Sequence, residues 1–297
     1  MSTILTEMPA VPGWVDREAY PFEHRWAELP GGRRMHYVDE GAGEPVVFVH
    51  GTPTWSFEWR HLVRELRSTH RCIAPDLLGF GLSDRPRDFA YTPEAHAEAV
   101  AQFVDALGLD GFTLVVHDFG GPIALPLALD GSGRVRRVVV LNSWMWSFRG
   151  DAEMERKAKI AGSGVGKWLY RNLNLSLRVI APSAYGDRRK LTPAIHRQYL
   201  APFADRWSRG AVLWALARAL LGSSEHYDAL WRKRDRLRAL PVLVVWGERD
   251  GAFPPPMLAR WREALPEARV VALPVGHWPH EEAPDEVLAA LRDFLRG

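Results

Sequence analysis

Short apolar runs alternate with amphipathic segments along most of the chain. The runs are rich in β-branched residues and almost continuously apolar, a pattern typical of strands buried on both faces of a parallel sheet. They are PVVFVH (45–50), RCIAPD (71–76), FTLVVHD (112–118), RVVVLN (137–142), PVLVVWG (241–247) and RVVALP (269–274). Helical periodicity predicts helices over 57–66, 93–107, 121–130, 256–265 and 282–296. The alternation predicts an α/β fold with parallel strands.

Two regions depart from this alternation. Near the start, PFEHRWAEL and RRMHYVDEG flank Pro30, Gly31 and Gly32, which predicts an antiparallel hairpin and brings the predicted strands to eight. From 143 to 238 no run of the buried-strand type occurs, and this stretch is too long for a connecting loop. We therefore predict a core formed by 1–142 and 239–297, and a helical cap formed by 143–238. The cap would lie over the carboxyl ends of the strands, where ligands bind in such folds.

Composition and charge narrow the classes of protein. Lys and Arg number 38 against 36 Asp and Glu, a net charge of +2, which lacks the basic excess of a nucleic-acid binder. Cys72 is the only cysteine, which excludes an intrachain disulfide and any multi-cysteine metal site. The N-terminal stretch lacks the pattern of a signal peptide, and no apolar run reaches the length of a membrane span. We expect a cytoplasmic protein without a nucleic-acid or membrane partner.

The motif VVHDFGG, residues 115–121, is the first candidate for chemistry. A predicted strand ends at Asp118, and small residues lead into a predicted helix. This is the pattern of a nucleophile elbow, a sharp strand-to-helix turn that exposes one side chain. The elbow position usually carries Ser in G-x-S-x-G, which occurs nowhere in this chain. Since Asp also commonly caps helices, the motif alone leaves both interpretations open.

Three further polar groups follow predicted parallel strands. They are the turn His50-Gly51-Thr52-Pro53, Asp250 in WGERD, and His277 in GHW. Because the carboxyl ends of parallel strands meet at one edge, we expect these groups to converge with Asp118. The chain order Asp118, Asp250, His277 is the order of nucleophile, acid and histidine in α/β hydrolases.

These segments resemble the haloalkane dehalogenase family. The resemblance runs from about residue 22 to the end and is weakest in the cap; it is carried by HYVDEGAGEPVVFVHGTPTWSFEWR, APDLLGFGLSDRP, YTPEAHAEAV, HDFGGPIALPLAL, LNSWMW, WGERD and VGHWPHEEAP. It implies the α/β-hydrolase fold, an eight-stranded and mostly parallel sheet with a helical cap inserted after strand 6. The motifs HG-x-P and HD-x-GG are shared with epoxide hydrolases, so they identify the branch better than the substrate.

The resemblance also implies a two-step covalent mechanism. Asp118 would be the nucleophile that expels halide and forms an alkyl ester, because a carboxylate attacks saturated carbon without losing a proton. His277, oriented by Asp250, would be the general base that activates water against the ester. The backbone N–H groups of Thr52 and Phe119 would form the oxyanion hole. A small apolar substrate and water would suffice, with no metal and no cofactor.

One part of the family pattern is missing. Haloalkane dehalogenases bind halide with the Trp after the nucleophile and with an Asn in the HG-x-P turn or a second Trp from the cap. This chain has Phe119 and Thr52 there, and Phe has no N–H. We predict that Phe119, Trp144 and Trp146 line the halide and substrate pocket. Other candidate indole donors are the cap residues Trp168, Trp207 and Trp214.

Two alternatives remain, and two minor motifs are assigned. An epoxide hydrolase would use the same three residues with cap tyrosines as donors, from among Tyr170, Tyr185, Tyr199 and Tyr227. A hydrolase-like binding protein would bind without turnover.

His277 and His280 do not form a helical metal-ligand pair, since Pro279 lies between them. Asn142 is predicted to position backbone near the pocket, and the oligomeric state stays open.

Overall fold

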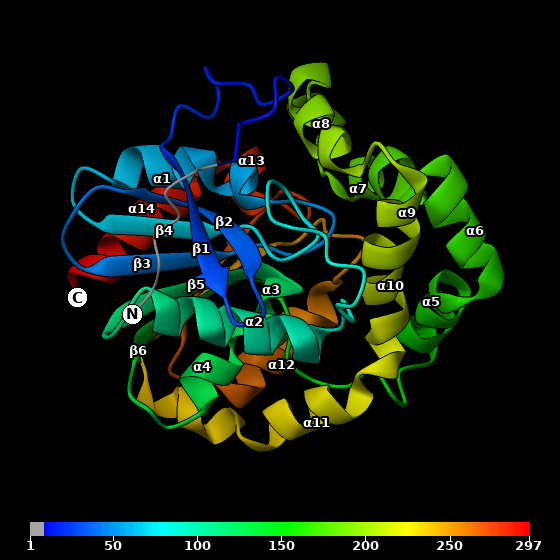
Figure 1. Ribbon diagram of the computed structural model, residues 1–297. Helices are drawn as coiled ribbons and strands as arrows, with labels where there is room; N and C mark the ends of the chain where they lie inside the picture. Colours follow the sequence, from blue (N-terminus) through cyan, green and yellow to red (C-terminus); the bar gives the residue numbers. More distant parts are fainter. Residues whose placement is uncertain (1–8) are drawn as a thin grey trace.

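An eight-stranded sheet crosses the middle of the protein (Figure 1). The computed structural model describes residues 9–297. Strands β1 and β2 form the predicted hairpin, β2 pairs antiparallel with β4, and all other neighbours are parallel. The order is β1-β2-β4-β3-β5-β6-β7-β8, with strands at His24–Leu29, Arg33–Glu40, Pro45–Val49, Arg71–Pro75, Phe112–Asp118, Val135–Ser143, Val242–Gly247 and Arg269–Leu273, numbered β1 to β8 along the chain. The prediction of eight mostly parallel strands is confirmed.

Helices cover both faces of the sheet. In Figure 1, α1 and α14 lie on one face, while α2, α3 and α12 lie on the other. The core helices are α1 (Arg60–Leu66), α2 (Pro93–Ala106), α3 (Gly120–Ala124), α4 (Pro126–Leu129), α12 (Pro255–Ala264), α13 (Pro279–Glu282) and α14 (Pro284–Arg296). α2 begins as its sequence indicates: Thr92 accepts a hydrogen bond from the N–H of Ala95, and Pro93 fills the first helical position.

Between β6 and β7 the chain is helical and lies beside the carboxyl ends of the parallel strands (Figure 1). Its helices are α5 (Ala152–Gly162), α6 (Gly164–Leu173), the π-helical turn η2 (Ser176–Ile180), α7 (Ala181–Ala184), α8 (Pro193–Leu200), α9 (Arg206–Ser208), α10 (Trp214–Gly222) and α11 (Ser224–Arg232). We refer to these helices as the cap; the exact domain limits remain a prediction. In residues 9–297 no helix is long and apolar enough to cross a membrane.

Prolines divide two of the predicted helices. The helix expected over 121–130 is α3 followed by α4, which starts at Pro126. The helix expected over 282–296 is α14, preceded by the short α13, and α14 begins at Pro284. A proline lacks the N–H that an interior helical position donates, so it starts a new helix more readily than it continues one.

The prediction that all parallel strands are buried on both faces is wrong for β8. The other parallel strands are almost wholly buried, whereas the residues of β8 are partly or fully exposed. The reason is its position: β8 lies at the end of the sheet and pairs only with β7. The apolar run RVVALP therefore forms a strand at the edge of the sheet and not in its interior. Cys72, in contrast, is fully buried in β4 as expected.

Candidate active site

The strand-to-helix turn after β5 holds Asp118 in a strained backbone conformation. Its φ of 49° lies in the left-handed region, which non-glycine residues rarely adopt and which recurs at functional sites. The turn also needs close packing, because a Cβ atom at Gly120 would overlap the carbonyl oxygen of Val49 in β3. The structure therefore has the geometry of a nucleophile elbow, with Asp118 at its apex.

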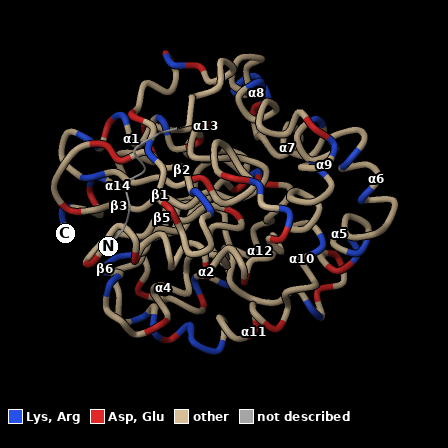
Figure 2. The backbone as a smooth tube through the Cα atoms, viewed as in Figure 1, with Lys and Arg blue, Asp and Glu red and all other residues tan. Residues whose placement is uncertain are grey.

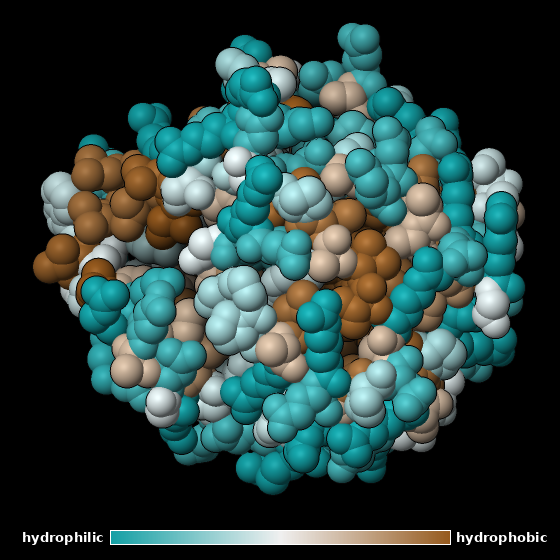
Figure 3. All heavy atoms as spheres, turned by 180° about the vertical axis from the view of Figure 1, so that it is seen from behind, coloured by the Kyte–Doolittle hydropathy of each residue, from teal (hydrophilic) through white to brown (hydrophobic). Residues whose placement is uncertain are grey.

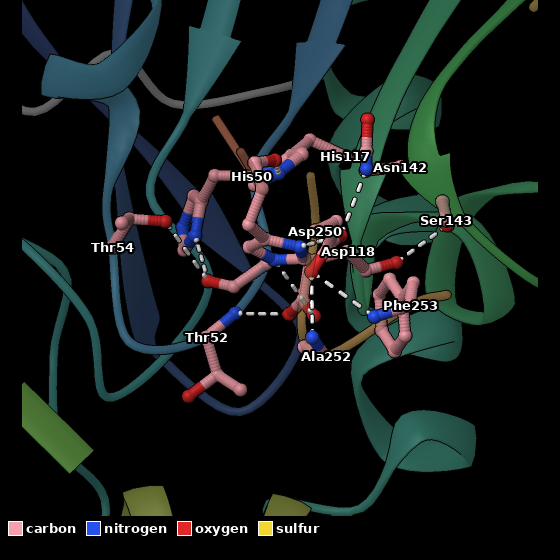
Figure 4. A network of polar contacts seen from close by, with 12 residues as sticks. His50, Thr52, Thr54, His117, Asp118, Asn142, Ser143, Asp250, Ala252 and Phe253 are labelled. Carbon is pink, nitrogen blue, oxygen red and sulfur yellow. Dashed lines mark hydrogen bonds and ion pairs between the residues drawn. The ribbon is translucent and has the colours of Figure 1, made fainter. Parts of the chain in front are cut away.

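The turn after β3 lies against the Asp118 carboxylate. The N–H of Thr52 donates to Asp118 Oδ1 at 2.8 Å, as Figure 4 shows. His50 holds this turn: its Nε2 accepts from the N–H of Leu77, so its Nδ1–H donates to the carbonyl of Gly51. No side chain fits at Gly51, where a Cβ atom would meet the Asp118 carboxylate. One of the two predicted oxyanion-hole donors is thus in contact with the carboxylate.

The loops after β7 and β8 complete the predicted triad. His277 Nδ1 lies 2.6 Å from Asp250 Oδ2, and His277 Nε2 lies 3.5 Å from Asp118 Oδ2. The backbone N–H groups of Ala252 and Phe253 donate to Asp250 Oδ1 at 2.7 and 3.0 Å. All three predicted side chains are buried and converge on one point, although they come from three different strand ends.

Asn142 does more than position backbone. At the end of β6, its side-chain amide donates to Asp250 Oδ2 at 2.8 Å and to the carbonyl of Gly247 at 3.2 Å (Figure 4). Its Oδ1 accepts from the N–H of Gly247 at 2.7 Å. Asn142 therefore links the turn after β7 to the acid of the triad.

Charge sets the protonation of the triad. Burial alone would lower the pKa of His277, but the carboxylates of Asp250 and Asp118 outweigh it and raise that pKa to about 10. Burial raises the pKa of Asp250, yet the His277 imidazolium and the donors around the carboxylate hold it below its usual value. At neutral pH His277 is therefore an imidazolium beside an ionised Asp250.

A largely apolar cavity of about 420 Å³ opens above Asp118. Thr52, Phe119 and His277 border it beside Asp118, and cap residues such as Met154, Ala161, Leu213 and Leu220 form apolar walls. The volume is within the range of small-molecule pockets. Of the four cap tyrosines, Tyr170 lines the cavity and the other three do not. Tyr199 instead donates to Glu281, and Tyr227 donates to the carbonyl of Ala219.

The predicted pocket residues Trp144 and Trp146 do not line this cavity. Trp144 is buried behind two rings that do line it, Phe119 at 4.8 Å and Phe253 at 4.9 Å. Trp146 packs between Trp231 and Trp261. The sequence after β6 does not show which aromatic rings line the cavity and which pack behind them. Phe119 does line the cavity as expected.

An indole from an unexpected position reaches the cavity. Trp278, directly after His277, lines it, and its Nε1–H has no hydrogen-bond acceptor among the residues described. Its ring lies edge-on to His277 at 4.6 Å and stacks on Tyr185 of the cap at 4.9 Å. The cap residue Ala184 also accepts a backbone hydrogen bond from the N–H of His277 at 2.9 Å. The loop of His277 and α7 are thus joined.

Behind His277 lies a buried cluster of three residues that the motifs did not predict: Glu58, His117 and His280. His117 Nε2 donates to the carbonyl of His277 at 2.9 Å, and its Nδ1 lies 3.3 Å from Glu58 Oε1. His280 Nε2 lies 3.8 Å from the same oxygen. Burial raises the pKa of Glu58, but the two imidazoles outweigh it and hold that pKa well below its usual value. An ionised Glu58 therefore faces the imidazole that holds the backbone of His277.

The donor atoms of this cluster lie within 4.8 Å of one another, so the spacing also suits a metal ion. The sequence carries one weak signal for the cluster: Glu58 is the single charge in the aromatic stretch Trp55–Trp59. His117 and His280 contact it only through the tertiary fold, which places positions 58, 117 and 280 together.

Comparisons with known proteins agree with this geometry. Residues 44–284 match the family model described as the alpha/beta hydrolase fold. Over 279 residues the chain is 36% identical to Haloalkane dehalogenase 2 of Mycobacterium tuberculosis, covering 93% of this chain and 96% of that protein.

The chain belongs to the haloalkane dehalogenase family.

Another haloalkane dehalogenase, DatA from Agrobacterium tumefaciens, has a similar solved structure, with a TM-score of 0.82 and 29% identity over 95% of this chain and 99% of that one. The chain is also similar to a protein named for a different reaction. Cis-3-alkyl-4-alkyloxetan-2-one decarboxylase of Shewanella oneidensis is 33% identical over 284 residues, covering 93% of this chain and 89% of that protein. The haloalkane dehalogenase scaffold of this chain is therefore shared by proteins named for two reactions.

Proposed function

We propose that the protein hydrolyses small apolar haloalkanes to alcohol and halide through an ester on Asp118. The observation that supports this most directly is the Asp118 side chain in the wall of an apolar cavity, with the N–H of Thr52 on one oxygen and His277 beside the other. Asp118 attacks the carbon that bears the halogen, the carbon–halogen bond breaks, and halide leaves with the bonding electrons.

Alkylation of Asp118 removes its charge, and this makes His277 available as the base of the second step. In the free enzyme Asp118 contributes to the raised pKa of His277. Once the carboxylate is alkylated its charge is gone, so the pKa of His277 falls and Nε2 releases its proton to solvent. Neutral His277 then takes a proton from water while the hydroxide adds to the Asp118 carboxyl carbon. Thr52 N–H, with that of Phe119 as the second proposed donor, stabilises the oxyanion, and collapse of the intermediate releases the alcohol.

A trapping experiment tests this reaction. We expect His277→Gln to form the ester but not hydrolyse it, so incubation with 1-bromobutane should release one equivalent of bromide. Mass spectrometry should then show one butyl group on the peptide that contains Asp118. Asp118→Asn is the matched control and should remain unmodified. An unmodified Asp118 in folded His277→Gln would contradict the proposal and leave a protein that binds without turnover.

A second candidate reaction uses the same nucleophile on an oxetan-2-one with two alkyl chains. It is favoured by the relative named for that decarboxylation and by Phe119, which offers no side-chain N–H to a departing halide. Asp118 would attack the saturated ring carbon that is bonded to the ring oxygen and carries an alkyl chain. The bond between this carbon and the ring oxygen would break, and the carboxylate formed would stay attached to the substrate. Loss of CO₂ would then supply the electrons of the alkene and expel Asp118. Alkene and CO₂ from a dialkyl oxetanone, without bromide from bromoalkanes, would favour this reaction.

The epoxide hydrolase alternative has less support. It requires two hydroxyl donors facing the epoxide oxygen, and Tyr170 is the one cap tyrosine among the cavity-lining residues that the structure describes.

A further inference from the structure

The outer surface of α5, α6 and η2 is apolar to an unusual degree. Within residues 9–297, the large apolar side chains that are exposed all come from this stretch: Ile160, Val165, Trp168, Leu173, Val179 and Ile180. Val165 and Trp168 are 71% and 56% exposed. Figure 3 shows an apolar group of side chains on the side of the molecule where these helices lie. A monomeric protein in water seldom exposes such a group without a partner.

The same surface is basic. From residue 156 to 186 the chain has no Asp or Glu, but it carries Arg156, Lys157, Lys159, Lys167, Arg171 and Arg178. Figure 2 shows the basic residues along α6 and the adjoining end of α5. Lys157 and Lys159 pair with glutamates on α5, whereas the other four have no carboxylate partner in the described part of the chain. Because the whole chain has a net charge of only +2, the remainder is net acidic. Positive charge is therefore concentrated on this surface of the molecule.

We call the six exposed apolar side chains and the six cations the cap face. The cavity reaches it, because the exposed residues Lys157 and Ile180 belong to both. Met154, Ala161 and Asp118 line the same cavity.

We propose that the cap face docks on an anionic lipid surface. An apolar helical face with an exposed Trp and flanking Lys and Arg is the composition of segments that lie in the interface of a bilayer, and it needs no membrane-spanning helix. The cations add attraction to anionic headgroups. A second copy of the chain fits less well, since a two-fold dimer through this face would bring together two sets of four cations that lack a carboxylate partner among the described residues. The docking is independent of the reaction at Asp118.

Vesicle co-sedimentation of the full chain tests the proposal. We expect more protein to sediment with vesicles of equal parts phosphatidylglycerol and phosphatidylcholine than with phosphatidylcholine alone. Arg178→Gln should weaken partitioning to the anionic vesicles about fivefold. Arg232→Gln is the matched control: this arginine is also exposed and without a carboxylate partner among the described residues, but it lies on α11. It should leave partitioning unchanged.

A second variant removes the apolar component. Trp168 was a candidate halide donor, but neither it nor Val165 lines the cavity. Val165→Ser/Trp168→Ser should therefore abolish sedimentation while the circular dichroism spectrum and halide release from a water-dissolved bromoalkane stay unchanged, which separates docking from folding and from the reaction. Equal sedimentation with both kinds of vesicle, or an equal loss with Arg232→Gln, would overturn the proposal. So would analytical ultracentrifugation that showed a dimer converted to monomer by the double variant, because a second copy would then cover the face.

Discussion

At the scale of single residues, Phe119 distinguishes this site from the family pattern. Its ring borders the cavity directly beside Asp118, where an indole N–H would otherwise face the leaving halide. A hydrogen bond to a charged group contributes about 1.5–3 kcal/mol. Its absence corresponds to a rate about 10- to 150-fold lower if no other donor acts. Trp278, whose N–H lacks an acceptor, lines the same cavity but from the side of His277.

Phe119→Trp should therefore accelerate halide release by about 10- to 150-fold. The measurement is the steady-state rate of bromide release from 1-bromobutane, with Phe119→Leu as the control that changes the ring without adding a donor. A Trp variant that folds normally and is no faster than the Leu variant would show that halide stabilisation does not limit this enzyme.

Glu58 should make the free energy of unfolding depend on pH. Because its pKa is lower in the folded than in the unfolded chain, ionised Glu58 stabilises the fold above its usual pKa of about 4.3, and this stabilisation is lost as pH falls below that value. Removing one partner of a buried polar contact costs about 1–3 kcal/mol. Urea unfolding should therefore show Glu58→Gln less stable than the parent by up to about this amount at pH 7, and by clearly less at pH 3. The same deficit at both values would mean that the charge of Glu58 does not act.

At the scale of elements, the site depends on close approach of two turns. The turn after β3 and the turn after β5 follow paired neighbouring strands, and they meet where Gly51 faces the Asp118 carboxylate. Both turns belong to the core, whereas the loop of His277 also contacts α7 of the cap.

Gly51→Ala should displace the Asp118 carboxylate and strain both turns. We expect a loss of about 1–3 kcal/mol in the free energy of unfolding, together with a severe loss of halide release. Gly164→Ala is the control, because nothing lies within 4 Å of a Cβ atom at that position in α6. Denaturant unfolding and bromide assays on both variants check this. Parental behaviour of Gly51→Ala would show that the turns have freedom to adjust.

At the scale of the whole molecule, charge and apolar surface gather on the side where the cavity opens. For a substrate dissolved in a bilayer, docking through the cap face would bring the cavity mouth to the place where the substrate is concentrated. The proposed reaction and the proposed docking would then support one another.

A long-chain bromoalkane held in anionic vesicles should therefore be hydrolysed at least several-fold more slowly by Val165→Ser/Trp168→Ser than by the parent chain. A short, water-dissolved bromoalkane should be hydrolysed equally by both. Bromide release measured side by side for the two substrates provides the comparison. Equal losses on both substrates would indicate damage to the site, and no loss on either would separate docking from turnover.

The sequence predicted those features of the fold and the site that depend on local patterns of residues. Buried-strand runs located the sheet, and the strand ends located Asp118, Asp250 and His277, because parallel strands bring their carboxyl ends together. The exposure of β8 was missed, since an apolar run does not report its number of neighbours. The burial of Trp144 behind Phe119 and Phe253 was missed for a similar reason. Glu58, His117 and His280 belong to three distant segments and carry no common motif, so only the tertiary structure shows them as a cluster.

The junction between α7 and the loop of His277 has a consequence for engineering this enzyme. The hydrogen bond from the N–H of His277 to Ala184 and the stacking of Trp278 on Tyr185 make α7 a support for His277, the proposed general base. A library that exchanges whole cap segments to change substrate range should therefore keep α7 and recombine α5 and α6. We expect insertions near Ala184 to displace His277 and to lower activity against every substrate alike, rather than to change specificity.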